Sequence, residues 1–351
     1  MKDKVESENL GYISLLSVIS AFAVVSLHTN GCFWQFSTER YWVTANILEC
    51  FWYFAVPVFF MISGVTLLDY PRRYDLRTFF VKRVQKTLLP FLFWSLAMWG
   101  YRLFCCFRDG REPDAAWLTF SGVWNGIWNT SFVGIYWFFI PLFACYLSVP
   151  LLAAVSEERK REIFTYLVGT AFLLHSVIPF LFSVFHVGLK WPFHVDAVSG
   201  YLLYVLLGYL VRACPPRKEI RNLIYGLAIL GLLAHICGTY VLSLEAEKIV
   251  KVYKGYLNVP CILYSVGVFL VLKEHADMIM RKCGRIVTWL TSYTFAIYLL
   301  HWPIMQEVVR FMDWNTHSIV YRVLGPFLIC GVAIVITWIL RKFRFGHWIL
   351  P

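Results

Sequence analysis

A single imidazole lies near the end of an apolar stretch that otherwise carries no charge. The stretch, residues 13–30, reads Ile-Ser-Leu-Leu-Ser-Val-Ile-Ser-Ala-Phe-Ala-Val-Val-Ser-Leu-His-Thr-Asn and could cross most of a bilayer as a helix. Ser17 and His28 are about three helical turns apart, so they share one face at a separation of roughly 16 Å. Its small residues suit tight packing against a neighbouring helix or the wall of a narrow ligand channel. Because an ionisable group inside a membrane is costly without a partner or a task, His28 is a candidate general base.

A carboxylate lies near the start of the second apolar stretch, residues 46–68. Glu49 enters the membrane from the side on which His28 leaves it, so two adjacent helices would bring these side chains together. A carboxylate bonded to an imidazole fixes its tautomer and raises its basicity, as a general base requires. The alternative is an interfacial Glu49 that is exposed to water. Pro57, further along the stretch, predicts a kinked or loosened helix.

A basic segment follows on the opposite side. It contains Arg77, Lys82, Arg83 and Lys86, and the last two stand three residues apart on one helical face just below the membrane. Such cations would bind a cytosolic ligand that carries phosphates. Anchoring of the membrane topology alone would also explain a basic loop, and the spacing does not separate the two interpretations.

Further polar residues come near the predicted outer side. His301 lies near the outer end of residues 286–305, level with His28, and either lines the same site or caps the helix end. His194 and Asp196 precede residues 197–212, where they contact an acceptor or belong to a solvated loop.

The composition indicates that membrane-spanning helices position these residues. The chain of 351 residues is 59% hydrophobic and 15% charged, whereas a soluble domain has about 25% charged residues. Its mean hydropathy is +0.63. We predict an all-α polytopic membrane protein, a single domain over residues 1–351 with about ten transmembrane helices in one bundle. The predicted spans are residues 12–29, 46–68, 88–106, 132–153, 163–185, 197–212, 222–243, 256–273, 286–305 and 321–342.

The distribution of charge predicts the orientation. The net charge of +11 comes from basic residues in short loops, which is typical of topology determinants and not of a nucleic-acid-binding surface. With the N-terminus inside, about 22 of the 32 lysines and arginines fall in the inner segments, so both termini are predicted to be cytoplasmic in a multi-pass protein of the cell membrane. The ten cysteines have no metal-ligand spacing, so we expect buried free thiols and no metal.

Several short motifs occur in one order along nearly the whole chain, residues 12–342. With them the chain resembles the acyltransferase-3 family of integral membrane acyltransferases, and within it the stand-alone members that O-acetylate surface polysaccharides. The motifs are the first-helix His28, Val56-Pro-Val-Phe-Phe-Met-Ile-Ser-Gly64, Lys82-Arg83 with Lys86 and Pro90, Tyr136-Trp137-Phe138-Phe139 leading to Pro150, Tyr204 with Gly208-Tyr209, and Tyr298-Leu-Leu-His301.

The resemblance implies a membrane O-acyltransferase. Such an enzyme would take an acyl group, usually acetyl, from cytosolic acetyl-CoA or another acyl-CoA and pass it to a hydroxyl of an extracytoplasmic glycan or other envelope acceptor. A covalent acyl-enzyme route stays open beside direct transfer. The implied partners are the lipid bilayer and the acceptor, without nucleic acid, and the oligomeric state is unassigned. The residues and the resemblance together predict a site with His28 and Glu49 as catalytic residues, Arg77, Lys82, Arg83, Lys86 and Ser17 at the donor, and Trp137, Tyr298 and His301 at the acceptor.

Two departures from the family pattern leave alternatives open. Ser17 stands where the family usually has an arginine, and Ser14 where it often has an acidic residue. Ile135 and Tyr136 stand where the family has a histidine. A non-catalytic relative is therefore one alternative. A transporter of a polar solute is another, although transporters often have inverted repeats and no such pairing of the two halves is visible.

Overall fold

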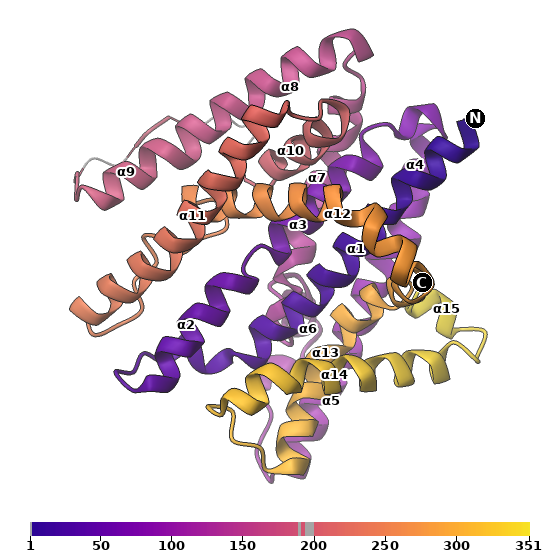
Figure 1. Ribbon diagram of the computed structural model, residues 1–351. Helices are drawn as coiled ribbons and strands as arrows, with labels where there is room; N and C mark the ends of the chain where they lie inside the picture. Colours follow the sequence, from indigo (N-terminus) through magenta and orange to yellow (C-terminus); the bar gives the residue numbers. More distant parts are fainter. Residues whose placement is uncertain (1, 189–190, 194–199) are drawn as a thin grey trace.

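The computed structural model describes residues 2–188, 191–193 and 200–351, and within these residues the regular structure is helical (Figure 1). Eight helical segments are long and apolar enough to cross a membrane. The predicted all-α polytopic class is confirmed. These segments are Gly11–Thr29, Arg40–Arg72, Leu76–Arg108, Gly134–Ala153, Glu157–Val184, Lys218–Glu245, Val259–Thr291 and Ile319–Leu340.

Fifteen α-helices are described, and π-helical turns interrupt two of the long segments, at Val84–Leu88 and Phe172–Val177. The α-helices are α1 (Lys2–Thr29), α2 (Arg40–Trp52), α3 (Ala55–Leu67), α4 (Leu76–Arg83), α5 (Leu89–Arg108), α6 (Phe120–Trp128), α7 (Phe139–Ala153), α8 (Glu157–Ala171), α9 (Ile178–Val184), α10 (Leu202–Ala213), α11 (Lys218–Glu245), α12 (Val259–Thr291), α13 (Thr294–Met312), α14 (Ile319–Leu340) and α15 (Gly346–Ile349).

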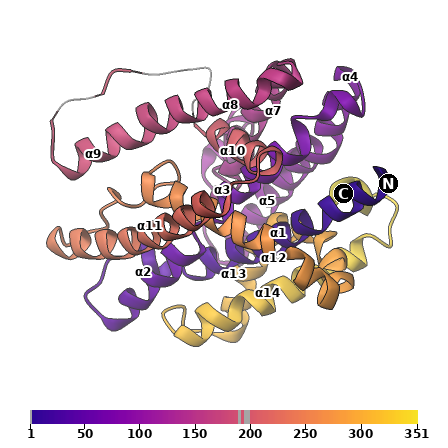
Figure 2. The same ribbon diagram turned by 45° about the horizontal axis from the view of Figure 1, so that its top comes forward.

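Helix α1 runs through the middle of the bundle and packs against α3, α12, α13 and α14 (Figure 1). The two chain termini lie at one end of the bundle in both views, and α8 and α9 follow one edge of it (Figures 1 and 2). We call the end of the bundle that holds the two termini the terminal end, and the end across the bundle from it the opposite end. His28, in the last turn of α1, is therefore placed at the opposite end of a buried central helix.

The second predicted span is not one continuous helix. It breaks at Tyr53 and Phe54, between α2 and α3, and Pro57 lies in the first turn of α3. Proline has no N–H to bond the carbonyl four residues earlier, which belongs to Tyr53, and its ring crowds that carbonyl. The expected loosening at Pro57 thus takes the form of a two-residue interruption of the helix just before it.

Helices α3 and α10 approach closely because each has a glycine at the crossing. A Cβ atom on Gly64 would lie 1.8 Å from the carbonyl oxygen of Val205, and one on Gly208 would lie 2.1 Å from that of Met61. The absence of a side chain at each glycine therefore lets the backbone of the other helix approach closely, as is common between membrane helices.

One predicted boundary differs from the structure, and another lies outside the described residues. Residues 274–285, expected as an inner loop, continue α12 as a helix to Thr291, and α13 begins only at Thr294. The loop contains no proline or glycine run that would end the helix, and its basic residues are good helix formers. The predicted span 197–212 begins outside the described residues, and α10 has 12 residues, so the count of ten spans stays a prediction.

Candidate active site

Three cavities follow one another along α1. The first, which we call the Lys86 cavity, has a volume of about 220 Å³ and is bordered by Val24, Ser63, Lys86, Thr87 and Tyr298 among others. The central cavity, of about 250 Å³, is bordered by His28 and Glu49. The third, which we call the vestibule, measures about 720 Å³ and lies among the last turn of α1, the turn Gly31–Trp34, α13 and the connection to α14.

Shared walls join these cavities into a row. The Lys86 and central cavities have Val24, Val56, Phe138 and Tyr298 in common. The central cavity and the vestibule share another five residues, which are Leu27, His28, Trp34, Ile135 and Trp137. On α1 the cavity walls are formed by Val24, Leu27, His28 and Thr29, so the row follows the last turns of the helix, and the small residues Ser14, Ser17 and Ala21 border none of the three cavities.

His28 forms a pair with His301 and not with Glu49. The Nδ1 atom of His28 lies 3.0 Å from Nε2 of His301, and Nδ1 of His301 lies 3.0 Å from the carbonyl oxygen of Ile297. The centroids of the two rings are 5.0 Å apart and their planes differ by 26°, which suits a hydrogen bond near both ring planes. His301 is completely buried, whereas His28 is half-buried and borders both the central cavity and the vestibule.

Glu49 borders the central cavity but bonds a lysine. Its Oε1 accepts from Nζ of Lys254 at 3.0 Å, and its Oε2 accepts from the amide of Asn30 at 3.4 Å. The oxygen of that amide accepts from Arg322 at 3.4 Å. Among the described contacts, the expected hydrogen bond between Glu49 and His28 is absent. A buried carboxylate is stabilised far more by a cation than by a neutral imidazole, which explains the different pairing.

An aromatic stack extends from Lys254 to the cavity wall. The Nζ atom of Lys254 lies 3.6 Å from the ring centroid of Tyr53. The Tyr53 ring lies parallel to that of Tyr256 at 4.2 Å, and Tyr256 stacks on Trp137 at 5.6 Å. Both tyrosines and the tryptophan border the central cavity. Tyr256 lies in the connection before α12, and burial raises the pKa of its hydroxyl well above the usual value.

The predicted donor residues separate into two groups. Lys86, in the π-helical turn, borders the Lys86 cavity, and Arg83 lies 5.5 Å from the ring of Tyr146, which forms part of the same wall. Arg77 is exposed and Lys82 covers the ring of Tyr74, so both lie away from the cavity walls. Ser17 is half-buried two turns before Val24 on α1, and it borders none of the three cavities.

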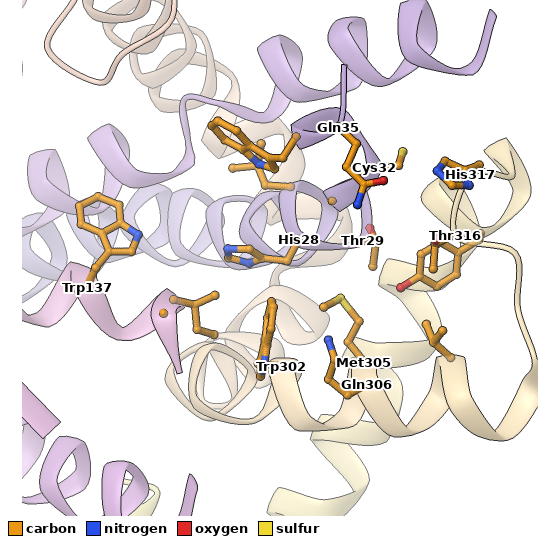
Figure 3. Close-up of a pocket in the computed structure, with 17 residues that line it drawn as sticks. His28, Thr29, Cys32, Gln35, Trp137, Trp302, Met305, Gln306, Thr316 and His317 are labelled. Atoms are coloured by element: carbon orange, nitrogen blue, oxygen red, sulfur yellow. The ribbon is translucent and has the colours of Figure 1, made fainter. Parts of the chain in front are cut away.

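The predicted acceptor residues also differ in position. In Figure 3 the His28 ring lies between Trp137 and Trp302, with Gln35 on one side of the vestibule and Gln306 on the other. Tyr298 borders the central cavity, and its hydroxyl donates to the carbonyl of Ile135. His301 contacts His28 and borders none of the three cavities. His194 and Asp196 lie outside the described residues.

Comparison with known proteins shows to which family the chain belongs. The sequence model of the acyltransferase-3 family, described as an acyltransferase domain, matches residues 10–342. The chain belongs to the acyltransferase-3 family. A protein of Bacillus subtilis (strain 168) named "Putative membrane-bound acyltransferase YfiQ" is 24% identical over 356 residues, covering 95% of this chain and 92% of the relative. No solved structure matches the chain. The predicted family is thereby confirmed, and with it the class of membrane acyltransferase.

Two cations of this acyltransferase-3 site were not predicted. Lys254 follows Lys248 and Lys251 in a short polar connection, and nothing in the sequence distinguishes it from them. Arg322 could have been found, because it lies at the start of the predicted span 321–342 and a charged residue within a membrane span is a functional candidate by default. Among the described side chains of this family member, no group of three or more His, Cys, Asp or Glu could hold a metal ion.

Proposed function

We propose that this protein is an acyl-CoA-dependent O-acyltransferase that transfers an acetyl group to a hydroxyl of an extracytoplasmic glycan or another envelope acceptor. The observation that carries the proposal is the row of cavities along α1, with Lys86 at one end and His28 at the junction of the central cavity and the vestibule. Two substrates could enter such a row from different sides and meet at His28.

The donor end is the Lys86 cavity. Lys86 and Arg83 would bind the phosphates of acetyl-CoA through charge-assisted hydrogen bonds. The thin acyl-bearing arm of the donor would extend between Val24, Val56 and Tyr298 into the central cavity, whose walls are largely apolar. In this proposal Arg77 and Lys82 attract the anionic donor to the surface, and Ser17 leaves room on α1 for its approach.

The acceptor end is the vestibule. Its aromatic walls are formed by Trp34, Trp137, Trp302 and Tyr321, and its polar groups include Gln35, Gln306, Thr316 and His317. Broad aromatic faces with a few convergent polar groups suit a sugar, which has apolar faces and many hydroxyls. Trp137 lines both the vestibule and the central cavity, and Tyr298 lines the central cavity, so both would border the reacting hydroxyl.

The proposed chemistry is direct transfer. His28 takes the proton of the acceptor hydroxyl while the oxygen attacks the thioester carbonyl carbon, and the carbon–sulfur bond then breaks. The imidazolium returns the proton to the departing thiolate of coenzyme A. Glu49 contributes a fixed ion pair with Lys254 to the cavity wall, beside the reacting groups.

The experiment uses inverted membrane vesicles that contain the full chain, incubated with radiolabelled acetyl-CoA. We expect label to enter the glycan fraction with the wild-type protein, and His28→Ala to lower the rate by about 10²–10⁴-fold at equal abundance. The double variant Arg83→Gln/Lys86→Gln is expected to raise KM for acetyl-CoA with kcat largely retained.

Three results would contradict the proposal. Uptake of a polar solute without acylation would favour a transporter. Absence of labelled product with a well-folded wild-type protein would favour a non-catalytic relative. A stable His28→Ala variant with more than about a tenth of the activity would remove His28 as the base.

A further inference from the structure

The hydrogen bonds around His301 determine which of its nitrogens carries the proton. Nδ1 of His301 is 3.0 Å from the carbonyl oxygen of Ile297. A carbonyl oxygen accepts hydrogen bonds and cannot donate one, so Nδ1 carries a hydrogen. In a neutral imidazole the other nitrogen, Nε2, then presents a lone pair. That nitrogen lies 3.0 Å from Nδ1 of His28.

This order of donors and acceptors fixes His28 as well. Because Nε2 of His301 accepts, Nδ1 of His28 must carry the hydrogen that is shared between the rings. Nε2 of His28 is then left with its lone pair, and His28 borders the central cavity and the vestibule. This tautomer is the one that can take a proton through Nε2.

We propose that His301 is a positioning residue that holds His28 in the tautomer and orientation of a general base, in the place where a carboxylate would be expected. The inference rests on the proposed function. His301 is completely buried and borders none of the three cavities, so it acts through His28 and not on a substrate. Its carbonyl partner comes from the preceding turn of α13, so His301 and the acceptor of its proton belong to the same helix.

All protons and bonds of the transfer step are accounted for with this arrangement. The acceptor hydroxyl gives its proton to Nε2 of His28, its oxygen forms a bond to the thioester carbon, and the carbon–sulfur bond breaks. The imidazolium, which still donates from Nδ1 to Nε2 of His301, returns the Nε2 proton to the thiolate of coenzyme A. His301 keeps its own proton throughout, as the orienting member of a catalytic triad does.

Two substitutions separate positioning from packing. His301→Gln keeps a side-chain carbonyl that can accept from Nδ1 of His28, whereas His301→Leu fills the site without any acceptor. With radiolabelled acetyl-CoA in inverted vesicles, we expect His301→Leu to lower kcat by about 10²-fold or more. KM for acetyl-CoA should stay within about twofold, because only the base is impaired. His301→Gln should regain at least about a tenth of the wild-type kcat. If the His301→Leu protein does not accumulate in the membrane, His301→Phe is used in its place.

The variant His28→Ala tests whether His301 acts through His28. Adding His301→Leu to it should cause no further loss, since residues that act as a unit are not additive. The inference is overturned if stable His301→Leu keeps more than about a third of kcat, if the Gln variant is no better than Leu, or if KM alone rises. An active His28→Ala variant would remove His28 as the base and this inference with it, whereas the absence of labelled product with the well-folded wild-type protein would overturn the proposed function itself.

Discussion

Glu49 is the residue whose surroundings differ most from expectation. Its side chain is 3% exposed and that of Lys254 is completely buried, so both charges are removed from water. Their 3.0 Å contact is supported by Asn30 on the other carboxylate oxygen and by the Tyr53 ring under the lysine. A buried pair of this kind is costly to break because the remaining charge has no partner. We therefore interpret Glu49 first as the counterion of Lys254.

The pair can be tested by a double-mutant cycle. Glu49→Gln should lower the free energy of unfolding by about 3–5 kcal/mol, because it leaves the ammonium of Lys254 buried without a countercharge. Lys254→Met should cost a similar amount, and the double variant should cost clearly less than the sum. Denaturant unfolding of the detergent-solubilised protein measures all three. Additive losses would show that the two side chains are not coupled.

Among the elements, the close crossing of α3 and α10 constrains the site. Gly64 and Gly208 bring the two backbones together, and α3 carries Val56 and Ser63 into the cavity walls. Helix α3 begins at the break before Pro57, so its position depends on this crossing and on its contacts with α1. The glycines therefore set the width of the row of cavities along α1.

Gly64→Ala should separate α3 from α10. The added methyl group would lie 1.8 Å from a backbone oxygen, which cannot move aside like a flexible side chain. We expect a loss of at least about 1–3 kcal/mol in unfolding free energy, with lower membrane yield. Gly331→Ala on α14 is the matched control, because no atom lies within 4 Å of its Cβ position. Equal unfolding temperatures for the two variants would exclude tight packing at the crossing.

At the scale of the whole molecule, the ends of the bundle differ in charge and in cavity lining. The terminal end carries the basic segment of α4 (Figures 1 and 2). The vestibule lies at the other end of α1, beside His28. Not every cation of the predicted inner loops is free to determine topology. Lys160 is buried, bonding Glu157 at 2.6 Å and Asp69 at 3.3 Å, and thus ties α8 to the end of α3.

The predicted orientation places the terminal end in the cytoplasm. An alkaline phosphatase reporter, which becomes active only outside the cytoplasm, is fused after Trp314 or after Pro351. We expect activity from the fusion after Trp314, in the connection between α13 and α14, and none from the fusion after Pro351. The reverse pattern would invert the molecule and move the Lys86 cavity away from cytosolic acetyl-CoA.

The sequence by itself determined the class of protein and the side of the bundle on which its candidate residues lie. Apolar length and helical periodicity are local properties, so they predict membrane-spanning helices without knowledge of the packing. The same holds for the position of His28 at the end of its helix and of Lys86 near the other side, since rise per residue alone fixes their heights. The family motifs are local as well, and they predicted the family.

The tertiary structure alone decided which side chains become partners. Neither the pairing of His28 with His301, 273 residues away, nor that of Glu49 with Lys254, 205 residues away, follows from height in the membrane. Several helices offer polar residues at one height, and packing angles such as that set by Gly64 and Gly208 select the neighbours. The buried carboxylate of Glu49 then pairs with the nearest cation, Lys254. His28 is therefore left to pair with a second imidazole, that of His301.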